Sequence, residues 1–292
     1  MRIPILIVGA VWAPPAWAHG NHAVAPGSLL SEWQPDLAVA AMLAAAAILY
    51  GSGLSRLWNR AGIARGIGML EATAFAFGLG ILALALLSPL ETVTGTLLTA
   101  HMIQHVLLIA IAPPLILMGR PDAAFAFAMP ALTSAAFLLA FLRRVARPLP
   151  AAALHALTIW IWHAPGPFQA ALQNEALHDL EHASFLLTAL LFWQSVIAAS
   201  RSPSSLIAAI VATLVTLIQS GFLGALLTLS GRLLYPSYSE SELWGLSSIE
   251  DQQLAGLVMW VPMGGIYLIA GLLLAARLIG VDERPASRRG VR

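Results

Sequence analysis

Apolar runs long enough to cross a bilayer recur along this chain of 292 residues, and they constrain its fold more than any other feature. A membrane helix needs ~20 residues, because it rises about 1.5 Å per residue. Only helices and closed barrels satisfy their backbone hydrogen bonds in lipid. The runs therefore predict an all-α, polytopic membrane protein with seven transmembrane helices, near residues 36–55, 67–88, 98–118, 150–169, 180–200, 204–229 and 254–276.

The composition favours the same class. Charged residues make up 10% of the chain and hydrophobic residues 59%, whereas a soluble domain carries about 25% charged residues. The chain has no cysteine. Disulfides and thiolate metal sites are thereby excluded, so a soft-metal site would have to use histidine and methionine. Nothing in the charge pattern indicates nucleic-acid binding.

All 15 basic residues are arginine, and their positions predict the orientation. Positively charged loops stay in the cytoplasm. With seven spans, an outside N-terminus and an inside C-terminus, every arginine after Arg2 except Arg232 falls on the cytoplasmic side, and most carboxylates fall outside. An eighth apolar run, 123–142, would reverse this pattern if it crossed. We therefore interpret it as a helix that lies on the cytoplasmic face or re-enters it.

The N-terminus has the pattern of a cleavable signal peptide. Arg2 precedes an apolar core, and Ala16-Trp17-Ala18 is a small-residue cleavage site; the alternative is an uncleaved anchor. Cleavage would make His19 the first residue, whose amine and imidazole could chelate copper with His22 as a third nitrogen donor. The predicted parts are a signal peptide at 1–18, an extended periplasmic arm at 19–35, the transmembrane domain at 36–276 and a cytoplasmic tail at 277–292.

Two pairs of histidines with the same spacing begin two of the runs. His101 and His105 open the third run, and His178 and His182 open the fifth. Residues four apart share one face of a helix, so the four imidazoles would meet if the two helices are neighbours. Four imidazoles are a ligand set that suits copper or zinc. The alternative is interfacial histidines that only hydrogen-bond to other helices.

Further candidates lie at the same predicted face of the membrane. Glu181 and Asp179 flank the second pair and could orient a ligating histidine. His163 closes the fourth run before two prolines, either as a fifth ligand or as a helix-end hydrogen-bond donor. Asp251 and Met259 share one face of the last span, which suits a transient soft-metal site. The alternatives are an acid at a helix N-terminus and a packing methionine.

These motifs resemble the CtaG family of seven-helix cytochrome c oxidase assembly factors, which is distinct from the single-span, cysteine-bearing copper chaperone of the same name. Gln194 departs from the pattern, since a second aromatic residue is expected after Trp193. The resemblance implies a role in maturing the copper-containing oxidase, with copper delivered on the outer face. It covers about residues 36–276 and rests on His101-Met102-Ile103-Gln104-His105 with Pro113-Pro114, Trp162-His163-Ala164-Pro165, His178-Asp179-Leu180-Glu181-His182 with Phe192-Trp193, and Asp251-Gln252 through Met259-Trp260.

The sequence thus predicts an assembly factor of a bacterial cytoplasmic membrane that performs no catalytic turnover. It would bind copper, as Cu(I) or Cu(II), at the periplasmic face and pass it to the copper-containing subunit of cytochrome c oxidase. Its partners would be that subunit and the lipid bilayer, and a homo-oligomer stays open. The alternative is a zinc-dependent intramembrane hydrolase in which the metal activates water, with Ser88 near a site of His101, His178, His182 and Asp251.

Overall fold

The computed structural model describes residues 24–128, 147–199 and 203–282. All regular secondary structure in these ranges is helical, as the apolar runs predict. In chain order the elements are α1 (Leu29–Glu32), α2 (Leu37–Ala61), α3 (Met69–Leu87), α4 (Pro89–Val93), α5 (Leu98–Val106), η1 (Leu107–Ile111), α6 (Ala112–Met118), α7 (Pro121–Ala128), α9 (Pro148–His163), α10 (Pro165–Gln173), α11 (Glu175–Ala198), α12 (Pro203–Leu229), η4 (Ser241–Trp244), α13 (Ser248–Val258), η5 (Met259–Met263) and α14 (Gly264–Asp282).

Six helical segments within these ranges are long and apolar enough to cross a membrane. Two of them are composite, since α5 continues through η1 into α6, and α13 continues through η5 into α14. They account for six of the seven predicted runs, and so a multi-pass membrane protein is confirmed. The segments are Leu37–Ala61, Met69–Val93, Leu98–Met118, Glu175–Ala198, Pro203–Leu229 and Ser248–Gly280.

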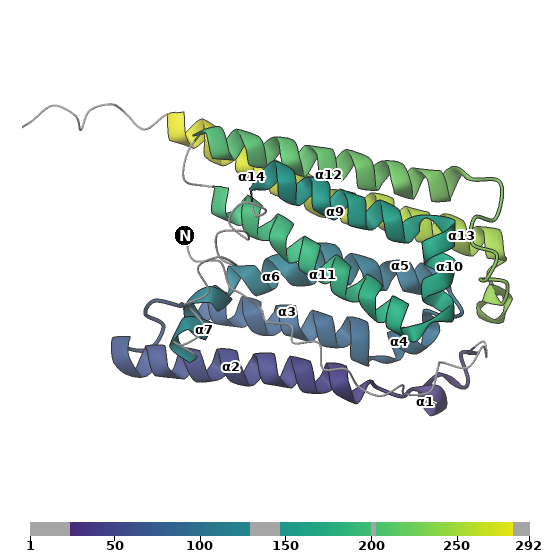
Figure 1. The fold of residues 1–292 in the computed structure, drawn as a ribbon, viewed down its shortest axis with the longest axis horizontal. Coiled ribbons are helices and arrows are strands. Elements are labelled where there is room, and N and C mark those ends of the chain that lie inside the picture. The colour runs from purple at the N-terminus through teal and green to yellow at the C-terminus, as the bar shows by residue number, and fades with distance from the viewer. Residues whose placement is uncertain (1–23, 129–146, 200–202, 283–292) are drawn as a thin grey trace, which may run out of the picture.

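The predicted run at 150–169 is two helices rather than one. α9 ends at His163 and α10 begins at Pro165, with Ala164 extended between them at a ψ of 138°. The residue before a proline avoids the helical region, which explains the break. The 16 residues of α9 span only about 24 Å, less than the ~30 Å hydrocarbon core. α9 nevertheless runs beside α11 and α12 and packs against both (Figure 1).

The long helices lie side by side, so that their termini form the two ends of one bundle (Figure 1). At one end α5, α11 and α13 begin and α9 finishes; we call it the histidine end, because it carries both histidine pairs. The opposite end carries the connection from α2 to α3, the connection from α6 to α7 and the start of α9. Every arginine of the described ranges except Arg232 lies toward that opposite end, in agreement with the predicted separation of charge.

The predicted arm is not extended over its described part. Residues 24–35 contain α1, which packs against α4. Val24 is buried, and its N–H donates to Thr96 Oγ1 at 2.9 Å. The arm is therefore tied to the histidine end by backbone contacts that hydropathy does not reveal. The predicted signal peptide lies outside the described residues.

α7 holds α2 at the opposite end of the bundle. Arg56 on α2 donates to the carbonyl oxygen of Ala128 at 2.9 Å. A Cβ added at Gly53 would lie 2.0 Å from the carbonyl oxygen of Ala124, so this close approach of α2 and α7 requires glycine. The rest of the predicted surface helix at 123–142, beyond Ala128, lies outside the described residues.

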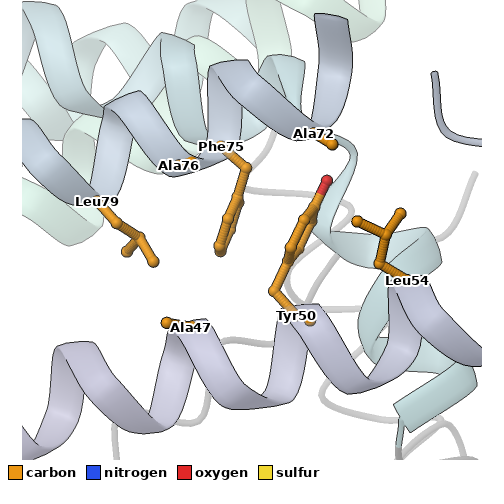
Figure 2. Close-up of a pocket in the computed structure, with 8 residues that line it drawn as sticks. Ala47, Tyr50, Leu54, Ala72, Phe75, Ala76 and Leu79 are labelled. Carbon is orange, nitrogen blue, oxygen red and sulfur yellow. The ribbon is translucent and has the colours of Figure 1, made fainter. Parts of the chain in front are cut away.

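An apolar groove separates α2 from α3 over part of their length (Figure 2). Its floor includes Tyr50 and Phe75, whose rings stack with centroids 3.7 Å apart. The Tyr50 hydroxyl donates to the carbonyl oxygen of Gly119 at 2.8 Å, which ties α2 to the end of α6. The lining residues are Ala47, Tyr50, Gly51, Leu54, Ala72, Phe75, Ala76 and Leu79.

Two π-helical turns, η1 and η5, interrupt the composite spans about two and a half to three turns after α5 and α13 begin. Pro113 follows η1, and because proline has no N–H it leaves the carbonyl of Ile109 without its usual helical donor. The Trp193 indole N–H of α11 donates to that carbonyl at 3.0 Å. The irregular turn thus fixes α11 against the composite span α5–η1–α6, which carries the first histidine pair.

Candidate metal centre

The two histidine pairs lie side by side at the histidine end. His101 and His178 are the fourth residues of α5 and α11, and His105 and His182 are the eighth. The two levels therefore differ by about 6 Å in depth. The ring centroids of the outer two are 5.5 Å apart and those of the inner two 5.6 Å. The matched spacing thus brings four imidazoles together.

The rings are largely withdrawn from solvent. His101, His105 and His182 are buried, whereas His178 is half-buried. One ring nitrogen of each buried histidine lies within 4.8 Å of the other two. A tetrahedral ion holds imidazole nitrogens about 3.3 Å apart, given metal–nitrogen bonds of ~2.0–2.1 Å, so only a modest closure of the rings is required.

Glu181 adds a carboxylate to the cluster. Its side chain is buried, and Oε1 lies 3.7 Å from His105 Nε2. Glu181 also forms a second ligand group with His101 and His178, whose donor atoms all lie within 4.8 Å of one another. The sequence predicts an orienting role for this residue. The structure brings it within ligand range instead.

Tyr238 fixes the proton on His101. Its hydroxyl donates to the carbonyl oxygen of Thr94 at 3.0 Å and lies 2.9 Å from His101 Nδ1. Burial raises the pKa of the Tyr238 hydroxyl well above its ordinary value, so the hydroxyl keeps its proton and accepts from Nδ1–H. His101 Nε2 has no hydrogen-bond partner and holds the lone pair that a metal ion needs.

His163 shows the same arrangement at the end of α9. Its Nδ1 lies 2.8 Å from the carbonyl oxygen of Ile159, which can only accept, so Nδ1 carries the proton. Nε2 is buried without a hydrogen-bond partner. The ring centroid is 5.4 Å from that of His105. The predicted helix-end hydrogen bond is therefore present, and Nε2 has no hydrogen-bond partner.

Buried polar atoms without partners concentrate in this cluster. Of ten such side-chain atoms in the described ranges, seven belong to the cluster: His101 Nε2, both ring nitrogens of His105, His163 Nε2, both carboxylate oxygens of Glu181 and His182 Nε2. Buried polar groups in native proteins are nearly always paired, and an unpaired group calls for an explanation such as a bound ion. The donor set of imidazoles and one carboxylate fits a copper or zinc ion.

Asp251 is engaged away from the rings. Its carboxylate accepts from the backbone N–H of Leu98 at 2.7 Å and of Thr99 at 2.9 Å. It therefore caps the N-terminus of α5, whose first N–H groups have no partner within the helix. It belongs to neither ligand group formed by the described residues. The predicted acid at a helix N-terminus is thus present. It lies in the first turn of α13 but caps α5.

The other predicted residues have varied positions. Met259 is buried in the hydrophobic core at the start of η5. Asp179 is exposed on α11. His155 on α9 lies in the core, where its ring nitrogens are 3.0 Å from the Thr188 hydroxyl and 3.4 Å from the Tyr267 hydroxyl. His19 and His22 lie outside the described residues.

Sequence reasoning does not find the loop between α12 and α13. Besides Tyr238, this loop carries Tyr235, whose hydroxyl donates to the carbonyl oxygen of His163 at 2.6 Å. Gln252 anchors the loop, since its side chain accepts from Leu234 N at 2.6 Å and donates to Arg232 O at 3.0 Å. The adjacent Asp251-Gln252 pair is a polar signal at a span entrance, but it does not indicate which loop it binds.

Comparison with curated proteins and with solved structures finds no match. Comparison with protein families matches residues 48–280 to Caa3_CtaG, described as cytochrome c oxidase caa3 assembly factor. The match extends from α2 to α14 and includes the whole histidine cluster. The resemblance carried by the four motifs is thereby confirmed, and the chain belongs to the family of cytochrome c oxidase caa3 assembly factors.

Proposed function

We propose that this assembly factor binds copper in the histidine cluster and delivers it to a copper-containing subunit of cytochrome c oxidase. The supporting observation is the set of unpartnered, buried imidazoles and one carboxylate at one end of the bundle. A site left in this state without a ligand is costly, because each unpaired buried group loses its hydration. A bound copper ion would compensate that loss.

We also propose the finer topology. α9 would be a seventh span despite its length, since it runs beside α11 and α12. Signal cleavage after Ala18 would leave the N-terminus outside and the C-terminus in the cytoplasm. The separation of arginines from the histidine end supports this orientation in a bacterial cytoplasmic membrane. The cluster would then face the periplasm.

The ligand chemistry suits delivery rather than storage. Imidazole and carboxylate bind copper less tenaciously than a closed thiolate cage, and the chain has no cysteine. His178 is half-buried, so the cluster reaches the surface at one residue of its outer level. No bond of a substrate needs to be broken for such a transfer, and we therefore propose a carrier rather than an enzyme.

The contacts of two residues argue against the zinc hydrolase. That reading requires Asp251 as ligand or base, but both of its oxygens accept backbone N–H groups of α5. It also uses Ser88, whose hydroxyl donates to the carbonyl oxygen of Leu84 at 2.5 Å and accepts from Leu90 N at 3.1 Å. Both side chains are therefore hydrogen-bonded to the backbone at helix termini.

The experiment is metal analysis of purified protein loaded with copper or with zinc. We expect wild type to retain copper and His101→Ala/His105→Ala to lose it. His155→Ala is the matched control, because it removes a buried histidine outside the cluster. Thermal unfolding in detergent identifies variants that lose copper only because they misfold. Equal copper in wild type and the folded double variant would refute the proposal, and retention of zinc alone would favour the hydrolase.

A further inference from the structure

We infer that the cluster offers one copper ion two alternative positions that share His101, and that the ion moves between them. The outer position consists of His101, His178 and Glu181. The inner position consists of His101, His105 and His182. This inference rests on the proposed function, because it describes how the same site would hold its cargo.

Depth and exposure distinguish the two positions. The outer position includes His178, which is half-buried and lies one helical turn inside α11. The inner position consists of buried side chains only. Its histidines His105 and His182 lie one turn deeper, and His163 is beside His105 with an unpartnered Nε2. An ion would therefore enter and leave through the outer position and be sheltered in the inner one.

The two positions exclude each other because of Tyr238. A neutral imidazole donates a lone pair from one nitrogen only. His101 Nδ1 is held by the Tyr238 hydroxyl at 2.9 Å, so Nε2 is the nitrogen left for an ion in either position. An imidazole could bridge two ions only through both nitrogens. Two ions at once are therefore disfavoured. The cluster holds one ion in either of two positions and is not a dinuclear centre.

A single site that uses all the ligands together is also disfavoured. Within the described ranges, neither ligand group contains both His178 and His105. The two groups overlap in His101 alone. Movement between them then requires exchange of two ligands around one retained nitrogen.

The test uses the full-length protein in detergent, with copper as the probe and two double variants. His178→Ala/Glu181→Gln removes the outer ligands, and His105→Ala/His182→Ala removes two of the inner ones. Copper per chain is measured by metal analysis, Cu(I) affinity by chelator competition, and Cu(II) ligation by electron paramagnetic resonance. Glu175→Gln is the control, because it removes a carboxylate from the first turn of the same helix.

We expect one copper per chain in wild type and in both double variants. The outer variant should keep a Kd within about threefold of wild type, because the inner position is intact, but release copper to a chelator about tenfold more slowly. The inner variant should bind more weakly, release copper faster and show an oxygen ligand. His101→Ala should weaken binding by about 100-fold, since it damages both positions.

Three results separate the possible failures. Two copper ions per chain in wild type would overturn the inference in favour of a dinuclear site. A loss of affinity in the outer variant as large as that in the inner variant would overturn it in favour of one site with shared ligands. Absence of copper binding by folded wild type would instead overturn the proposed function itself.

Discussion

Replacing Asp251 by asparagine should loosen the start of α5, which carries the first histidine pair. The carboxylate accepts from Leu98 N at 2.7 Å and from Thr99 N at 2.9 Å, and it is fully buried. Asparagine keeps the shape of the side chain but presents one oxygen and one NH₂ group. One of the two backbone N–H groups would then face another donor.

The magnitude follows from these two contacts. Hydrogen bonds to a charged acceptor contribute about 1.5–3 kcal/mol each, and a buried donor left unpaired costs about 1–3 kcal/mol. Asparagine retains one neutral bond of about 1 kcal/mol, and removal of a buried charge offsets part of the loss. We therefore expect a destabilisation of about 2–4 kcal/mol, or a fall in Tm of roughly 5–10 °C.

The assay compares Tm and copper content of Asp251→Asn with those of Glu250→Gln. Glu250 is exposed and belongs to the capping box of α13, which glutamine preserves, so this control removes the same charge with little loss of stability. We expect a lower Tm for Asp251→Asn alone, with copper content following the stability of the protein. A variant that loses its copper at unchanged Tm would show that Asp251 is a ligand and would refute the capping account.

Three further outcomes are expected. Tyr238→Phe should weaken copper binding by about 10- to 100-fold, measured by chelator competition, because it frees His101 Nδ1; an affinity equal to that of Tyr235→Phe would contradict this. Met259→Leu should leave copper content unchanged at a cost in stability below ~1.5 kcal/mol, because Met259 packs in the hydrophobic core, and loss of Cu(I) by the folded variant would show that its sulfur is a ligand. Reporter fusions after Arg147 and after Arg292 should both report the cytoplasm, and a periplasmic signal from either would overturn the seven-span topology.

The span positions could be predicted because lipid imposes one demand on every segment. A backbone in hydrocarbon must bond to itself, so hydropathy and length suffice to find six of the long helices. The clustering of His101, His105, His178 and His182 could be predicted for a related reason. Each pair lies near the start of a helix, and α5 and α11 begin at the same end of the bundle, so equal spacing places the pairs at equal depths.

The contacts between distant segments could not be predicted. Asp251 bonds to residues more than 150 positions earlier in the chain, and Tyr238 reaches His101 from a loop that has no periodicity. Periodicity indicates which face of a helix is buried but not which neighbour covers it. The break at Ala164 was visible in the flanking prolines. Because apolar character continues across it, hydropathy alone merges α9 with α10.

The number of residues in the π turn between α5 and α6 determines the direction in which His101 and His105 point relative to α6. A π turn accommodates one residue more than an α turn, and each residue rotates a helix by about 100°. Loss of one residue from Leu107–Ile111 would leave a continuous, equally apolar helix, yet it would turn the face bearing His101 and His105 by that angle relative to α6. The number of residues between His105 and Pro113 is thus a geometric constraint on the site, although these residues supply it with no ligand.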